Sequence, residues 1–155
     1  MGFFHIRKID NVLSAGGLPD STTHIEELKK EGFSTIVSLE PLQPGLINFA
    51  RSQGLKHVNL HVGWGKEVPF EKLKRFLSIV ALAEAKGEKI FLHCLQGKDR
   101  SGEVIAAYML AKKAFDRSRE LGLEGPLRLI RYRDEVQAHF ERTLARAKKY
   151  KPKIR

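Results

Sequence analysis

The segment over residues 89–115 constrains the fold more than any other part of this 155-residue chain. An apolar run over 89–93 predicts a buried strand, and an apolar run over 101–115 predicts a buried helix. A decapeptide over 93–102, with two glycines, joins them. A strand, loop and helix of this kind form the unit of a parallel α/β sheet, in which ligands bind beyond the carboxyl ends of strands. The loop contains Cys94, the only cysteine of the chain.

The rest of the chain continues the alternation of strands and helices. Short β-branched or alternating runs predict strands over 3–9, 12–15, 35–39 and 56–62. Capping residues and apolar periodicity predict helices from Asp20 or Ser21 to Glu31, over 46–53, and from Pro69 to about Ala85. A polar connection over 116–125 precedes a further helical segment that opens at Pro126, and the last basic stretch begins at Arg142.

These elements predict an α/β fold in a single domain over residues 1–155. The central sheet is expected to be mainly parallel, with four to five strands flanked by helices. The expected core residues of the helix that follows Pro69 are Leu73, Phe76, Leu77, Val80 and Leu82. A basic C-terminal tail is expected at about 148–155.

The composition of the chain limits the cellular compartment that we expect for it. One cysteine excludes an internal disulfide, and no basic-then-apolar leader is visible, so we expect a cytoplasmic monomer with a reduced thiol. Charged residues interrupt every apolar run before it reaches the roughly 18 to 20 residues of a membrane span, so none is expected. Few Asn and Gln beside many Lys, Arg and Glu are typical of a heat-adapted source.

The formal net charge of +10 attracts anionic partners over a Debye length. Phosphorylated proteins, small phosphorylated substrates, nucleic acid and an acidic lipid surface all fit this charge. Nucleic acid is disfavoured because no zinc spacing or RNA-binding aromatic motif accompanies it. The histidines outside the decapeptide over 93–102 show no metal-ligand spacing with acidic or thiol partners, so neither a metal nor a cofactor is expected.

The decapeptide has the residue types that a phosphate-binding loop with a nucleophile requires. Loop amides and the dipole of the following helix favour a dianion, and the same field stabilises a thiolate at Cys94. Arg100 is suited to a bidentate fork on phosphate, while Gly97 and Gly102 let the backbone turn and approach closely. His93 is expected to order the loop through a bond to backbone. The expected phosphate-binding residues are Leu95, Gln96, Gly97, Lys98, Asp99 and Arg100.

The pattern His93-Cys94, two residues, Gly97, two residues, Arg100-Ser101-Gly102 resembles the loop of protein tyrosine and dual-specificity phosphatases. The order of elements from about Val12 onward also resembles the compact, atypical dual-specificity type. The resemblance implies the cysteine-phosphatase fold, with Cys94 as nucleophile, Arg100 as phosphate clamp and Ser101 aiding breakdown of a phosphocysteine. It implies metal-independent hydrolysis of phosphotyrosine, and of phosphoserine or phosphothreonine because so short a chain lacks the loops that deepen a tyrosine-only pocket.

The general acid stays open between Asp99, Glu67 and no dedicated acid. The family places an Asp a few residues before a Pro on a separate loop, but the matching stretch over 64–69 carries Gly65 or Lys66 there, with Glu67 one or two places off. The run Lys98-Asp99-Arg100 resembles bacterial tyrosine and lipid phosphatases, and a carboxyl beside a phosphate dianion tends to keep its proton. Alternatively, Asp99 caps a helix that starts near Ser101, or pairs with Lys98.

Several alternatives concern substrate and function class. Lys98 either favours phosphoinositides and inositol phosphates or is a solvated lysine, and Gln137 either matches the family glutamine that positions water or is an ordinary helix-surface residue. A non-catalytic module that binds phosphate or polyanions is favoured by the missing loop Asp, but Cys94, Arg100 and Ser101 argue against it. A thiol redox or arsenate-reducing enzyme is disfavoured because no second cysteine is present.

Overall fold

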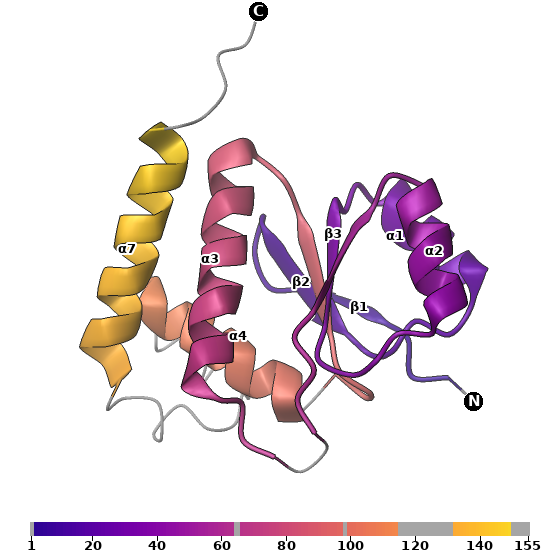
Figure 1. The fold of residues 1–155 in the computed structure, drawn as a ribbon, viewed down its shortest axis with the longest axis horizontal. Coiled ribbons are helices and arrows are strands. Elements are labelled where there is room, and N and C mark those ends of the chain that lie inside the picture. The colour runs from indigo at the N-terminus through magenta and orange to yellow at the C-terminus, as the bar shows by residue number, and fades with distance from the viewer. Residues whose placement is uncertain (1, 64–65, 98, 115–131, 150–155) are drawn as a thin grey trace, which may run out of the picture. The chain divides into compact units, whose positions relative to one another are not determined.

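The structure is a computed structural model that describes residues 2–63, 66–97, 99–114 and 132–149 (Figure 1). The chain divides into two compact units. The first unit comprises residues 1–67 and 88–101 and contains a five-stranded sheet. The second comprises residues 68–87 and 102–155, and its described part is helical. No helix in the described ranges is both long and apolar enough to span a bilayer.

The sheet of the first unit places one strand at the centre of the site. Its strands lie in the order β1-β2-β5-β3-β4. Their bounds are β1 Ile6–Lys8, β2 Leu13–Gly16, β3 Thr35–Ser38, β4 Lys56–Asn59 and β5 Ile90–His93. β1 pairs antiparallel with β2, and every other pairing is parallel. His93, the last residue of β5, is in register with Gly16 on one side and Ser38 on the other.

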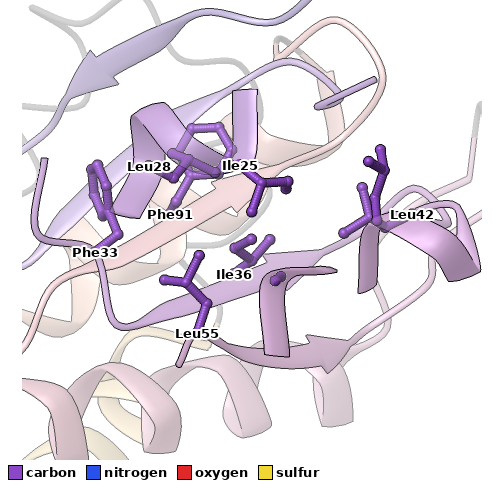
Figure 2. Close-up of a cluster of buried hydrophobic side chains, with 9 residues drawn as sticks. Ile25, Leu28, Phe33, Ile36, Leu42, Leu55 and Phe91 are labelled. Atoms are coloured by element: carbon purple, nitrogen blue, oxygen red, sulfur yellow. The ribbon is translucent and has the colours of Figure 1, made fainter. Parts of the chain in front are cut away.

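Helices α1 (Thr22–Lys30) and α2 (Pro44–Ser52) lie side by side in the first unit (Figure 1). The Ser21 hydroxyl accepts a bond from the N–H of His24, which caps α1, and Pro44 occupies the first turn of α2, where its missing N–H costs nothing. Their apolar sides join a buried cluster that Figure 2 shows. The cluster comprises Ile25, Leu28, Phe33, Ile36, Leu42, Leu46, Ala50, Leu55 and Phe91. Burying each larger side chain contributes about 1.5–3 kcal/mol, so the cluster holds both helices to the sheet.

The second unit contains α3 (Phe70–Lys86), most of α4 (Asp99–Ala111) and α7 (Arg133–Lys149). α3 and α7 lie side by side (Figure 1), and the Nε2 of His139 on α7 lies 2.9 Å from Ser78 Oγ and 3.1 Å from the Lys74 carbonyl oxygen on α3. Tyr108 of α4 packs edge-on against Phe140 of α7, with ring centroids 6.1 Å apart. These contacts tie the three helices together.

The expected α/β class with a mainly parallel sheet is confirmed, and it has five strands. The expected strands are longer than the observed ones at both 3–9 and 56–62, because only residues 6–8 pair in the first range and only residues 56–59 in the second. The single domain over 1–155 stays a prediction. The segments expected at 116–125 and Pro126 lie outside the described residues, as does the chain from 150 onward.

Two local expectations are wrong. Leu82 is 44% exposed rather than part of the core, because it lies two residues beyond Val80, and about 100° per residue turns it away from the buried stripe. α4 begins at Asp99 and not near Ser101, which places Arg100 in its first turn, and it ends at Ala111. Lys148 and Lys149 belong to the last turn of α7, and the basic tail at about 148–155 stays a prediction.

Candidate active site

The candidate site is the loop that follows β5, with Cys94 as its first residue. The Cys94 side chain is buried, and the N–H of Gly97 donates to its sulfur at 3.2 Å. The sulfur therefore lies against the amide of Gly97 in its own loop. This geometry arises because β5 ends at the centre of the sheet and the chain turns at once into α4.

Backbone bonds to the surrounding scaffold set the direction of the loop peptides. His93 Nδ1 lies 3.0 Å from the Cys94 carbonyl oxygen, and the N–H of Leu18 donates to the Leu95 carbonyl at 2.9 Å. In a planar trans peptide the N–H points opposite to the carbonyl. The N–H groups of Leu95 and Gln96 are therefore directed to the side of their peptides away from His93 and Leu18. Donors that are aligned in this way are what an oxyanion needs.

Gly97 seats the loop against the end of β2. Its φ is +79°, a left-handed conformation that side chains rarely adopt. A Cβ at this position would lie 2.6 Å from the carbonyl carbon of Gly16 and 2.9 Å from Cε1 of His5. The loop therefore packs backbone to backbone on β2, and only glycine fits there.

The Arg100 side chain is held in place by Nη1, which makes two contacts. It is 4% exposed, and Nη1 donates to the Val62 carbonyl at 2.6 Å and lies 2.9 Å from Glu40 Oε1. Glu40 comes two residues after β3, and Val62 lies on the segment that follows β4. A buried guanidinium without partners would cost several kcal/mol. Glu40 and Val62 therefore stabilise Arg100 next to the loop with a fixed orientation.

His93 supports the loop as a neutral side chain. It is fully buried, and burial lowers its pKa to about 4. Because a carbonyl oxygen only accepts, Nδ1 must carry the proton that it shares with Cys94. The unprotonated Nε2 then lies 2.6 Å from the hydroxyl of Ser38, which lies 2.9 Å from Nε2 of His57.

The other predicted site residues have different environments. Ser101 is fully buried, and its hydroxyl has no hydrogen-bond partner within the described part of the chain. Gln96 and Glu67 are exposed, Leu95 is half-buried and Gly102 is buried. Lys98 lies outside the described residues, as does the side chain of Asp99, whose backbone starts α4. Gln137 donates from its amide to the Leu110 carbonyl at 3.0 Å, and its role stays a prediction.

Sequence reasoning missed the residues that support this loop, namely Glu40, Val62, Ser38, His57 and Leu18. One signal was available for Glu40 and Ser38. Both lie at or just beyond the end of β3, and parallel strands bring their carboxyl ends to the same sheet edge. Val62 and Leu18 contribute only backbone atoms, so their residue types give no signal.

Comparison with known proteins shows the family of the chain and agrees with its fold. The family model described as the Swiss Army Knife protein, DSP-PTPase phosphatase domain, matches residues 8–148. The chain belongs to this family of cysteine phosphatases, of the atypical dual-specificity type. It is accordingly a phosphatase, a hydrolase of phosphate esters that takes phosphorylated substrates.

Solved structures with the same fold include several phosphatases. Tk-PTP in its active form is 19% identical, with 88% of this chain and 96% of that chain covered and a TM-score of 0.66. PTPMT1 in complex with PI(5)P is 16% identical, with 92% and 98% covered and a TM-score of 0.67. TpbA of P. aeruginosa is 17% identical, with 90% of each chain covered and a TM-score of 0.64. At these identities the likeness shows the fold alone.

The close contact of Gly97 with Gly16 can be tested by substituting two glycines that both have a positive φ. Gly32→Ala, at φ +89° with open space around it, is expected to lower the free energy of unfolding by about 1–2 kcal/mol through backbone strain. Gly97→Ala adds a collision with Gly16 to the same strain, so we expect a larger loss. Urea unfolding of both variants measures the difference. Equal losses in the free energy of unfolding of the two variants would contradict the backbone-to-backbone contact between Gly97 and Gly16.

The buried His93 predicts a loss of stability in acid. Its pKa is about 4 in the folded chain and near 6.5 unfolded, so the unfolded state binds more protons between these values and the free energy of unfolding falls as pH falls. The contribution of about 3 kcal/mol is complete above pH 6.5 and is lost towards pH 4. Urea unfolding at several pH values measures this loss. The free energy of unfolding should fall less steeply with falling pH in His93→Asn than in the wild type. An NMR titration of His93 with a midpoint near 6.5 would contradict this.

Proposed function

We propose that this chain hydrolyses phosphomonoesters without a metal, through a phosphocysteine on Cys94. The observations that carry the proposal are the Cys94 sulfur, bonded by a loop amide, and, six residues later in the same unit, a buried Arg100 whose side chain Glu40 and Val62 hold. A nucleophile beside an anion cradle is the arrangement that transfer of a phosphoryl group requires.

In the first step the Cys94 thiolate attacks phosphorus, so the S–P bond forms as the bond to the leaving oxygen breaks. The amides of residues 95–100 and Arg100 stabilise the equatorial oxygens. Nη1 of Arg100 is committed to Glu40 and Val62, so the edge formed by Nε and Nη2 is the one assigned to a bidentate fork on the phosphate.

In the second step water attacks phosphorus and the S–P bond breaks, which returns the electron pair to sulfur. Ser101 is the proposed donor to that sulfur. Its buried hydroxyl has no other partner in the described ranges, which supports this role, because buried hydroxyls are normally satisfied. His93 and Gly102 support the loop and do not exchange protons with the substrate.

The general acid is proposed to be Asp99, with Glu67 as the alternative. Asp99 is the first residue of α4 and precedes Arg100, so its backbone lies at the helix end that faces the bound anion. Glu67 is exposed on the segment after Val62. A carboxyl near a dianion keeps its proton at a higher pH, which suits it to protonating the leaving oxygen.

Phosphotyrosine is the proposed substrate, with phosphoserine and phosphothreonine accepted as well. Phosphoinositides or inositol phosphates are the second candidate class. The net charge of +10 and Lys98 in the loop favour them, and PTPMT1, which shares the fold, is seen in complex with PI(5)P. The single thiol must stay reduced for this chemistry, so we propose a cytoplasmic location, and a monomer as the working form.

Replacing the nucleophile tests the mechanism. Cys94→Ser is expected to lower kcat for p-nitrophenyl phosphate by about 10³-fold or more, because the chain has no second thiol. The assay contains EDTA, and orthovanadate is expected to inhibit the wild type. Lys86→Ala, at the exposed end of α3, is the control and keeps the wild-type rate. Retained turnover in Cys94→Ser would refute the phosphocysteine, and binding of phosphopeptide without hydrolysis by the wild type would favour the non-catalytic module.

Two isosteric variants test which carboxyl group is the general acid. Asp99→Asn is expected to lower kcat/KM for phenyl phosphate, a poor leaving group, by about 10²- to 10⁴-fold and to remove the alkaline limb of its pH profile. The loss with p-nitrophenyl phosphate is smaller, because that leaving group needs little protonation. Glu67→Gln serves as the matched comparison. If Glu67→Gln shows the larger loss and Asp99→Asn keeps the alkaline limb, the roles are reversed.

A further inference from the structure

A row of polar side chains crosses three strands of the first unit and ends at the loop. His57 lies on β4, Ser38 ends β3 and His93 ends β5. His57 Nε2 lies 2.9 Å from Ser38 Oγ, Ser38 Oγ lies 2.6 Å from His93 Nε2, and His93 Nδ1 lies 3.0 Å from the Cys94 carbonyl oxygen. Ser38 and His93 are fully buried, and His57 is half-buried at the edge strand.

The position of every proton in this row follows from the last acceptor. The Cys94 carbonyl accepts only, so His93 Nδ1 carries a hydrogen and, in the neutral ring, Nε2 does not. The hydroxyl of Ser38 must therefore donate to His93 Nε2. Having used its only hydrogen, Ser38 Oγ accepts from His57, so His57 Nε2 carries a hydrogen as well. All donors point in one direction, from β4 to the loop.

We propose that His57 and Ser38 are positioning residues that fix the tautomer and orientation of His93, and through it the direction of the Cys94–Leu95 peptide in the phosphate cradle. The proposal rests on the proposed function, because the cradle is the one that holds the transferred phosphate. Both residues act through His93.

The consequence for the cradle is geometric. A bond from His93 to the Cys94 carbonyl holds that oxygen, and the planar peptide then directs the Leu95 N–H to the other side. If His93 took the other tautomer, two acceptors would face each other at this carbonyl and the peptide would be released to rotate. The preorganised donor of Leu95 would be lost, although the nucleophile and Arg100 would remain.

Burial and the nearby cations favour the neutral form of both histidines in the row. Arg51 of α2 lies near His57, and burial together with this cation lowers the His57 pKa. Burial dominates in lowering the His93 pKa; the bond to the Cys94 carbonyl and the charge of Glu40 oppose this effect, and His57 and Arg100 reinforce it. Protonation of His57 adds its hydrogen at Nδ1, so the donor to Ser38 persists. The direction of the hydrogen bonds along the row reverses only when His93 itself takes a proton on Nε2.

The first test reads the tautomers directly, in the protein without substrate. Long-range ¹⁵N–¹H NMR at pH 7 is expected to show His93 as the Nδ1–H tautomer and His57 as the Nε2–H tautomer. The His93 signals are expected to shift in His57→Leu and to stay in place in His57→Gln, whose amide still donates to Ser38. A His57 that carries its hydrogen on Nδ1 alone overturns the proposal.

The second test measures turnover of p-nitrophenyl phosphate and inhibition by orthovanadate. Misplacing a catalytic group by about 1 Å can cost about 10²-fold, so we expect His57→Leu to lower kcat/KM about tenfold and to weaken vanadate inhibition. His57→Gln is expected to restore both. Ser38→Ala should lose at least as much, and adding His57→Leu to it should change nothing more, because His57 acts only through Ser38.

His139→Leu is the matched control, because His139 also bonds a serine but belongs to the second unit. It is expected to leave the kinetic constants and the His93 signals unchanged. Wild-type constants in His57→Leu, or additive losses in the double variant, overturn the proposal. A wild type that turns over no phosphomonoester refutes the proposed function instead, and the tautomers and vanadate binding then still decide whether the row positions the loop.

Discussion

The parallel pairing of β5 with β2 and β3 is the constraint on which the site depends. It brings Gly16, His93 and Ser38 to the same level of the sheet. Gly97 then rests on Gly16, and His93 meets Ser38. Because side chains alternate along a strand, a slip of one residue would turn His93 to the opposite face and separate the loop from its supports. The register of the sheet thus determines the shape of the cradle.

The supports of the loop fall into two kinds that act on different atoms. Hydrogen bonds from Leu18 and His93 hold backbone carbonyls, whereas Glu40 and Val62 hold the Arg100 side chain. Both kinds come from segments that follow neighbouring strands or from the strands themselves. The buried apolar cluster beneath α1 and α2 fixes β3 and β5 relative to these helices, so the rigidity of the core is transmitted to the site.

The sequence predicts the part of the site that is continuous in the chain. The apolar run before Cys94, the two glycines and the apolar run after Arg100 are local signals, and they predict the strand, the loop and the helix, although the helix begins two residues earlier, at Asp99. The stripe of Leu73, Phe76, Leu77 and Val80 also predicts the buried side of α3. Leu82 fails because hydrophobicity alone does not place a residue on a stripe. The supports from other segments depend on strand order and on backbone atoms, which residue types do not reveal.

The contact between Gly97 and Gly16 is made by backbone atoms, with the His5 ring beside them. A larger residue at position 97 has no room there, so this contact cannot be varied to suit a different phosphate ester. Selectivity among phosphate esters is therefore expected to be adjusted at exposed positions of the loop, such as Gln96, and not at Gly97.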